Sequence, residues 1–202
     1  MSKTQRIYQF KITLLNTKPP IWRRIQVPEN YTFWDLHVAI QDSMGWEDYH
    51  LHQFEFSDVN KNNEVIIGLP DEESPPSFRQ NILAVWEQPI AQWFTPEQSK
   101  AKYWYDFGDD WWHSVVLEKI LPIEPGIAYP RCIAGKRACP PEDCGGPWGY
   151  LNLLEVLNNP KHKRFKELSY WLGKTFDSEY FEPEKVVFDN PHERLKIAFS
   201  QR

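Results

Sequence analysis

The sequence predicts an α+β protein, in which an antiparallel or mixed β-sheet is covered by helices within a single domain spanning residues 1–202. In the first half of the chain, apolar and polar residues alternate with the period of two that marks a half-buried strand. In the second half, apolar residues recur at helical spacing instead. Strands therefore come first and helices later, without the strand–helix alternation that a doubly wound parallel sheet requires.

The first elements follow from periodicity and from capping residues. Alternating apolar side chains predict a strand over residues 8–14, and "IWRRIQV" predicts a second strand over 21–27. A helix is expected next, because Thr32 is suited to cap it and Asp35 stands at the position that completes a capping box. Gly45 is a suitable end for this helix, since glycine adopts the left-handed conformation at little cost.

Two hairpins are predicted in the middle of the chain. "LHQFEF" and "EVIIGL" form the first around the polar turn "SDVNKNN", and "KYWYDF" and "WHSVVLEKI" form the second around Gly108–Asp110. The acidic, proline-containing segment 70–77 between them is expected to be an exposed loop.

Helices are predicted in the last third of the chain. Residues 150–157 have apolar side chains at i, i+3, i+4 and i+7, and Pro160 ends this helix. A second helix is expected over 165–172. The last helix should begin after Asn190 as its cap, with Pro191 in its first position.

Composition excludes several classes of protein. The aromatic content of 15% is far above that of disordered chains, so the chain is expected to fold. A net charge of −5 argues against a protein that coats nucleic acid over its whole surface, although it permits a local basic patch. The N-terminal residues lack the apolar stretch of a signal peptide, and no segment approaches a membrane span. We therefore expect a cytoplasmic protein with no membrane partner.

Three cysteines fall in the segment "YPRCIAGKRACPPEDCGG", with the spacing Cys132-x6-Cys139-x4-Cys144. An odd number of cysteines in a reducing compartment favours thiols or metal ligands over disulfides. A Cys₃His zinc site is one interpretation, with His113 as the fourth ligand and zinc as the cofactor. The alternative is that the cysteines are small apolar residues that fill gaps in an ordered loop.

A second candidate site consists of acids near a histidine. Asp106, Asp109, Asp110 and His113 lie near the second hairpin turn, and Glu142 and Asp143 lie in the cysteine segment. Together they offer oxygen ligands for a hard cation, or an acid/base pair for hydrolysis. The alternative is ordinary turn chemistry for the aspartates and a core position for His113, which shares a strand face with apolar neighbours.

A basic run and a pair of histidines each permit both a binding role and a structural one. Lys161, Lys163, Arg164 and Lys166 are candidates for contacts with nucleic-acid phosphates, although most such runs are solvated helix faces. His50 and His52 either line a pocket or form a hydrogen-bonded pair at a strand start. No nucleophile elbow, zinc-protease motif, dinucleotide-binding fingerprint or kinase signature is present.

Three segments in this order, "MGWEDYHLHQFEF", "YDFGDDWWHSVVLEKI" and "YPRCIAGKRACPPEDCGGPWGY", resemble the plasmid pRiA4b ORF-3-like family. The resemblance implies a single α+β domain of a prokaryotic family that is often encoded on plasmid or mobile DNA. The family is functionally uncharacterised, so the resemblance implies no catalytic or ligand residue. The family's marked positions are His50, Leu51, Phe54, Asp106, Gly108, Asp109, Trp111, His113, Cys139, Pro140, Pro141, Glu142, Asp143, Gly145 and Gly146.

Two functions remain open on the sequence alone, so whether the chain is an enzyme is undecided. The first is a non-enzymatic interaction module for a protein or nucleic-acid partner, associated with plasmid or mobile-element biology. The second is a metal-dependent hydrolase that uses the Asp109/Asp110/His113/Glu142/Asp143 cluster. Convergence of these side chains on one pocket would favour the enzyme, whereas pairing with backbone groups would favour the interaction module.

Overall fold

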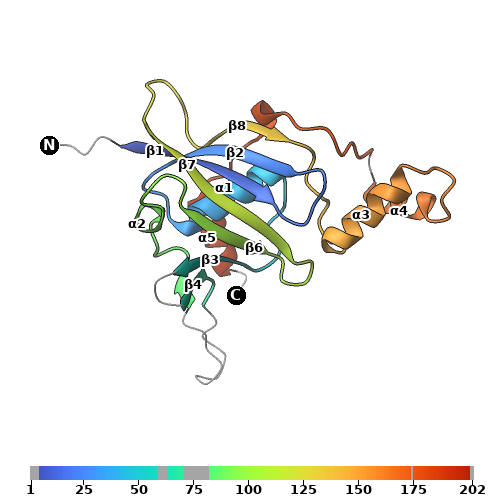
Figure 1. Cartoon of the computed structure of the whole chain (residues 1–202), viewed down its shortest axis with the longest axis horizontal. Helices are drawn as coiled ribbons and strands as arrows, with labels where there is room; N and C mark the ends of the chain where they lie inside the picture. Colours follow the sequence, from blue (N-terminus) through green and yellow to red (C-terminus); the bar gives the residue numbers. More distant parts are fainter. Residues whose placement is uncertain (1–4, 59–62, 71–81, 174, 201–202) are drawn as a thin grey trace, which may run out of the picture.

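The computed structural model describes residues 5–58, 63–70, 82–173 and 175–200, and within them one mixed eight-stranded sheet dominates (Figure 1). The strands are β1 (Arg6–Leu14), β2 (Ile21–Pro28), β3 (His52–Asp58), β4 (Asn63–Gly68), β5 (Ile82–Ala84), β6 (Lys100–Tyr105), β7 (Trp111–Pro122) and β8 (Arg131–Lys136). Their order across the sheet is β5-β4-β3-β6-β7-β1-β2-β8. Neighbouring strands run antiparallel except β4 and β5, which are parallel.

The helices complete an α+β arrangement, which is the fold class that the sequence predicts. They are α1 (Phe33–Met44), α2 (Ile90–Trp93), α3 (Gly146–Leu157), α4 (Phe165–Leu172) and α5 (Pro191–Ser200), with a short 3₁₀ helix, η1, at Pro183–Lys185. Among the described residues, no helix has both the length and the apolar composition that a membrane span requires.

The core lies between α1 and one face of the sheet. Phe33 of α1 packs edge-on against Phe54 of β3, with ring centroids 4.9 Å apart, and both side chains are fully buried. Burial of one such side chain stabilises the fold by about 2–3 kcal/mol. The predicted capping box is present, since Asp35 N–H donates to Thr32 Oγ1 and Thr32 N–H donates to Asp35. Gly45 ends α1 in the left-handed conformation (φ 89°), as expected.

The predicted strands, both hairpins and the three C-terminal helices are present, whereas four elements were not predicted, namely β5, α2, β8 and η1. The first part of the cysteine segment, interpreted from the sequence as irregular, is the edge strand β8, which pairs with β2. Its sequence "RCIAGK" alternates poorly because a neighbouring strand, rather than a core face, determines its conformation. The short elements β5 and α2 carry too few residues to show a period. Of the predicted loop over 70–77, all but Pro70 lies outside the described residues.

A buried arginine ties the edge of the sheet to the C-terminal segment. Arg23 is 1% exposed, and its guanidinium donates to the carbonyl oxygens of Trp22, Ser43 and Lys136. The ring of Phe181 stacks 3.6 Å from the guanidinium carbon. Phe181 also covers Gly135 of β8, where a Cβ would lie 2.2 Å from the ring.

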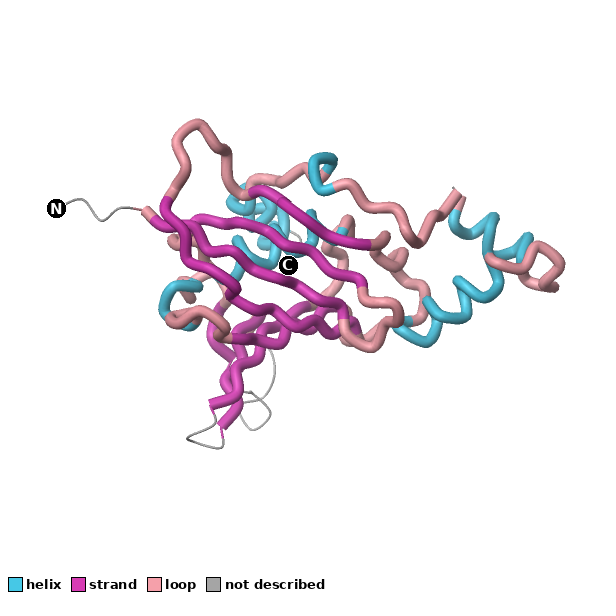
Figure 2. Tube along the Cα trace, turned by 45° about the horizontal axis from the view of Figure 1, so that its top comes forward, coloured by secondary structure: helices cyan, strands magenta, loops and turns pink. Residues whose placement is uncertain are grey.

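Helices α3 and α4 project away from the sheet as an arm, which we define as residues 147–173 (Figures 1 and 2). The inner side of α3 is buried through Tyr150, Leu153 and Val156. Helix α4 has no buried residue. The arm is therefore fastened through α3 and presents much of α4 to solvent.

Candidate functional site

The cysteine segment docks on the turn between β6 and β7, and we name this contact the joint (residues 139–146 with 106–110). Asp109 Oδ2 accepts a hydrogen bond from Gly145 N–H at 3.0 Å. Gly146 sits so close to Asp109 that a Cβ would lie 2.2 Å from its carbonyl oxygen. On the other side, Trp46 Nε1–H donates to Pro140 O at 2.9 Å. The joint is thus a closely packed, hydrogen-bonded contact from which α3 begins.

The aspartates of the turn are largely used by the turn itself. Asp106 has a left-handed backbone (φ 54°), and its Oδ1 accepts hydrogen bonds from the backbone N–H groups of Gly108 and Asp109 at 2.9 and 3.2 Å. Asp110 Oδ1 accepts a hydrogen bond from Trp112 Nε1–H at 2.8 Å. Asp109 and Asp110, both predicted as catalytic candidates, therefore bind groups of the protein itself.

His113 is a core residue. It is fully buried, and its ring packs against Trp46 and Tyr103 at centroid distances of 5.3 and 5.2 Å. Nδ1 lies 3.3 Å from the carbonyl oxygen of Tyr103. Burial lowers the pKa of His113 to about 3, so the ring is neutral near pH 7. Trp46 contacts both His113 and the cysteine segment.

Glu142 is held at the centre of the joint. Its Oε1 accepts hydrogen bonds from Glu47 N–H at 2.9 Å and from Tyr105 Oη–H at 3.1 Å. Burial raises the pKa of Glu142, while those two hydrogen bonds and the nearby His50 act in the opposite direction. Its other oxygen, Oε2, is buried and has no hydrogen-bond partner among the described residues.

The cysteines are free thiols. Burial raises the pKa of Cys132 and of Cys139, while the charge of Arg23 lowers both values. Burial also raises the pKa of Cys144, to about 12. Two groups of side chains in the described part of the chain bring their metal-ligating atoms close together, and neither contains a cysteine or His113. The thiolate zinc site stays a prediction.

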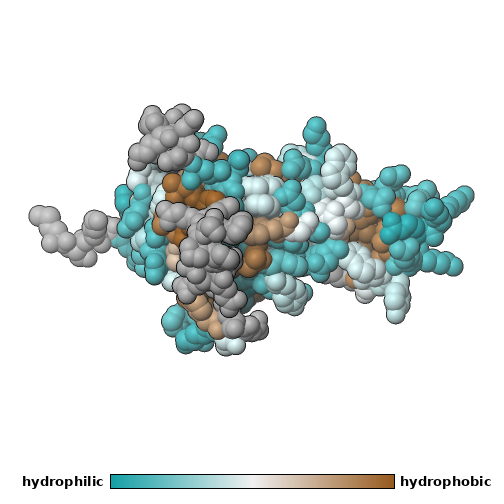
Figure 3. All heavy atoms as spheres, turned by 90° about the horizontal axis from the view of Figure 1, so that it is seen from below, coloured by the Kyte–Doolittle hydropathy of each residue, from teal (hydrophilic) through white to brown (hydrophobic). Residues whose placement is uncertain are grey.

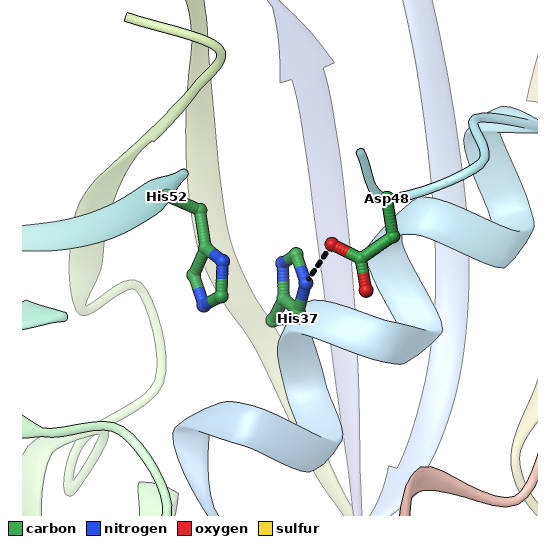
Figure 4. Close-up of side chains that lie close together, drawn as sticks. All are labelled: His37, Asp48 and His52. Atoms are coloured by element: carbon green, nitrogen blue, oxygen red, sulfur yellow. Dashed lines mark hydrogen bonds and ion pairs between the residues drawn. The ribbon is translucent and has the colours of Figure 1, made fainter. Parts of the chain in front are cut away.

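The first of these groups is His37, Asp48 and His52 (Figure 4). The two imidazole rings stack with centroids 3.4 Å apart. His37 already uses both ring nitrogens, since Nε2 lies 2.7 Å from Asp48 Oδ1 and Nδ1 lies 2.8 Å from Tyr103 Oη. Arg194 of α5 lies 3.4 Å from the second oxygen of Asp48. His37, Asp48, Tyr103 and Arg194 therefore form a buried polar network on one side of the stacked imidazole rings.

The second group is His50, Asp106 and Asp143, drawn from the segment before β3, the β6–β7 turn and the cysteine segment. His50 Nε2 lies 3.5 Å from Asp106 Oδ2 and 3.2 Å from Asp143 Oδ1. One imidazole and two carboxylates can hold a divalent cation. The sequence identified Asp143 and the joint, but it assigned the histidine to His113 instead of His50.

The basic run lies where the sequence placed it, at the connection from α3 to α4. Lys161, Lys163 and Lys166 are exposed. None of them forms an ion pair with another residue in the part of the chain that the structure describes. Arg164 forms an ion pair with Glu167 at 3.0 Å. Three of the four predicted phosphate-binding groups are thus available to a ligand.

Aromatic residues of the arm escaped prediction. Trp148 and Tyr170 are 84% and 90% exposed, and Trp171 is 47% exposed. One feature of the sequence could have identified them. These aromatic residues lie outside the apolar face predicted for each helix, and large aromatic side chains are unusual on a face exposed to solvent.

Comparisons with known proteins give matches of three kinds. The sequence model described as plasmid pRiA4b ORF-3-like protein matches residues 6–185. An uncharacterized protein of Sinorhizobium fredii, y4hQ, is 37% identical over 177 residues, which cover 85% of this chain and 84% of that protein. The crystal structure of a protein of unknown function, MM3350, from Methanosarcina mazei Go1 is 46% identical, with a TM-score of 0.82 over 92% of this chain and all of that one.

Proposed function

The chain belongs to the plasmid pRiA4b ORF-3-like family, and on that premise we propose that it is a non-enzymatic interaction module that binds a protein partner through the arm. The observation that carries this proposal is the exposure of Trp148 and Tyr170, at 84% and 90%. The relatives are uncharacterised and supply no activity. The link to plasmid or mobile-element biology rests on the family name and belongs to the proposal.

Exposed aromatic side chains of this size favour association. Trp and Tyr dominate the binding energy of protein interfaces, because each buries a large apolar area while its polar edge still finds a hydrogen bond. Trp148 lies in the first turn of α3, and Tyr170 and Trp171 lie in the last turn of α4. Apolar surface is visible at the end of the molecule that carries these helices, bordered by hydrophilic side chains (Figure 3).

Charge indicates the kind of partner. The arm carries four basic residues, Lys161, Lys163, Arg164 and Lys166, and two acidic ones, Glu155 and Glu167. Its net charge is therefore +2, and the rest of the chain carries −7 of the total of −5. A partner with an apolar surface and an acidic rim would complement the arm.

The distribution of these groups favours a protein over a nucleic acid. Surfaces that bind single-stranded nucleic acid combine stacking aromatics with basic groups along one groove. In the arm, the free lysines 161, 163 and 166 lie in and just after the connection between the helices, whereas the exposed aromatics lie at the opposite helix ends.

The hydrolase alternative has less support. Asp109 and Asp110 accept hydrogen bonds from Gly145 and Trp112, and Glu142 accepts two. His113 is fully buried. These side chains therefore pair mainly with groups of the protein. We further propose that the protein works in the cytoplasm, which agrees with free thiols at all three cysteines. We also propose that the chain forms one domain, because a single sheet unites its described strands.

The test is comparative capture from cells that express the protein natively. Wild-type protein and the Trp148→Ala/Tyr170→Ala variant are immobilised side by side, and an Ile133→Ala variant on β8 serves as the control. We expect the wild type and the control to retain a protein that the arm variant loses, and the purified partner to bind the wild type at least tenfold more tightly than the arm variant.

Three results would contradict the proposal. The arm variant could retain the same protein, nuclease treatment could abolish capture, or no protein could bind. If the only partner is a second copy of the chain, light scattering will show a dimer. The proposal of a foreign protein partner would then be replaced by self-association.

A further inference from the structure

Three segments that are distant in sequence deliver one imidazole and two carboxylates to a single point beside the joint. We propose that His50, Asp106 and Asp143 bind a divalent transition-metal cation, with Glu142 next to them as a further ligand. The ligand atoms of the first three all lie within 4.8 Å of one another. This site goes beyond the proposed binding role of the arm and does not depend on it.

The spacing of the ligand atoms fits a shared ion. Two atoms bound to one zinc-sized ion at about 2.0–2.1 Å and at a tetrahedral angle lie about 3.3–3.4 Å apart. The distances from His50 Nε2 to Asp143 Oδ1 and to Asp106 Oδ2 are 3.2 and 3.5 Å. Although Nε2 of His50 is buried, it forms no hydrogen bond of acceptable geometry with any described residue. It faces the carboxylates without bonding to them.

Asp106 is built to act as a ligand. Its side chain is 8% exposed, and Oδ1 is held by the N–H groups of Gly108 and Asp109. Oδ2 lies 3.5 Å from His50 Nε2. Hydrogen bonds like those to Oδ1 orient the ligands of metal sites, and their loss typically weakens metal binding by about 10- to 100-fold. The second observation that indicates a cation is that His50 Nε2 and Glu142 Oε2 are buried without a hydrogen-bond partner among the described residues.

The residues around Asp106 fix the other ligands. Asp106 N–H donates to Leu51 O at 3.0 Å, which fastens the turn to the residue after His50. The His50 ring packs edge-on against Tyr105, with centroids 5.8 Å apart. Glu142 Oε1 is held by Tyr105 and Glu47, which leaves its buried Oε2 without a hydrogen bond among the described residues.

The ligand types select the cation. Imidazole nitrogen suits zinc, iron and related transition metals, and carboxylate oxygen suits manganese as well, whereas calcium and magnesium prefer oxygen alone. Solvent reaches the site, since the Asp143 side chain is 70% exposed and His50 lines a cavity of about 250 Å³. A cation can therefore enter, and water can complete its coordination.

Calorimetric titration of the full chain tests the site, after treatment with a chelator. Zn²⁺ and Mn²⁺ are the probes, and we expect one equivalent of at least one of them to bind. His50→Gln and Asp106→Asn should each weaken binding at least tenfold. Because Asp106→Asn can also disturb the turn, Asp143→Asn provides an exposed ligand variant, for which we expect the same loss with an unchanged melting temperature. Asp110→Asn is the matched control, since that carboxylate binds Trp112.

Cobalt distinguishes this site from a thiolate site. Co²⁺ bound to His50 and carboxylates shows no sulfur-to-metal charge-transfer absorption, and Cys139→Ser and Cys144→Ser should leave binding unchanged. The proposal is overturned if neither cation binds. It is equally overturned if binding survives His50→Gln and Asp143→Asn, or if it disappears in the cysteine variants.

Discussion

The joint and the arm follow each other in the chain, yet they are built in opposite ways. In the joint, Gly146 has no room for a side chain and Asp109 binds Gly145 N–H. In the arm, Tyr170 is 90% exposed and α4 has no buried residue. The acids that look catalytic in the sequence mostly hold the joint together. The residues best placed to meet a partner lie on a helical surface without a recognisable motif.

The largest difference in stability should come from adding one methyl group to the joint, at Gly146, and one to the end of the arm, at Gly173. Gly146 and Gly173 both have positive φ values, 67° and 63°, but only Gly146 lacks space for a Cβ. We expect Gly146→Ala to lower the free energy of unfolding by about 3 kcal/mol or more, because backbone strain and overpacking add. Gly173→Ala should cost about 1 kcal/mol through backbone strain alone.

Urea denaturation of the two variants measures this difference. Equal losses would show that Gly146 is no more closely packed than Gly173, and the contrast between joint and arm would disappear.

Acid should destabilise the protein through His113, which lies behind the joint. Because burial lowers its pKa from 6.5 to about 3, the unfolded chain binds a proton first as the pH falls. Stability is therefore present above pH 6.5 and is lost below it, by about 2 kcal/mol between pH 7.5 and pH 5. His113→Gln should remove this part of the pH dependence in urea unfolding, whereas His192→Gln, at an exposed position, should retain it. A wild-type pH dependence in His113→Gln would contradict the core assignment.

A smaller difference in the free energy of unfolding should distinguish Asp109, an acid of the joint, from Glu155, an acid of the arm. Asp109→Ala removes the acceptor for Gly145 N–H and should cost about 1–1.5 kcal/mol. Glu155→Ala, at an exposed position of α3, should change the free energy of unfolding by less than about 0.5 kcal/mol. Thermal or urea unfolding measures both, and a neutral Asp109→Ala would mean that the hydrogen bond across the joint contributes nothing.

The smallest effect should come from the exposed aromatics. Trp148→Ala and Tyr170→Ala should each alter stability by less than about 0.5 kcal/mol, because these side chains bury little area within the chain. A loss above about 1 kcal/mol in either variant would assign that residue a packing role and weaken the case for a partner.

The sequence predicted the elements whose pattern is local. Strands β1 and β2 and helix α1 follow from alternation and capping residues, since one buried face imposes its period on the sequence. Strand β8 was missed because its conformation depends on pairing with β2, which no local pattern records.

The sequence named acids of both segments that meet in the joint, but it grouped them with His113, which lies in the core. Acids of the cysteine segment and of the hairpin turn form one candidate cluster in the sequence, and the hydrogen bond from Gly145 to Asp109 joins these two segments. The core alternative for His113 is the observed one, since strand alternation places it beside Val115 and Leu117. His50 precedes its strand in an irregular segment, so no period indicated where its ring would point.

The most direct test of the account is photo-cross-linking from the arm. A photoreactive amino acid replaces Tyr170 in one variant and Ile133 of β8 in the control, and both are expressed in the native cells. The account predicts a protein adduct of defined mass from position 170 and none from position 133. Adducts from position 133 alone, adducts with nucleic acid, or no adduct from position 170 would contradict it.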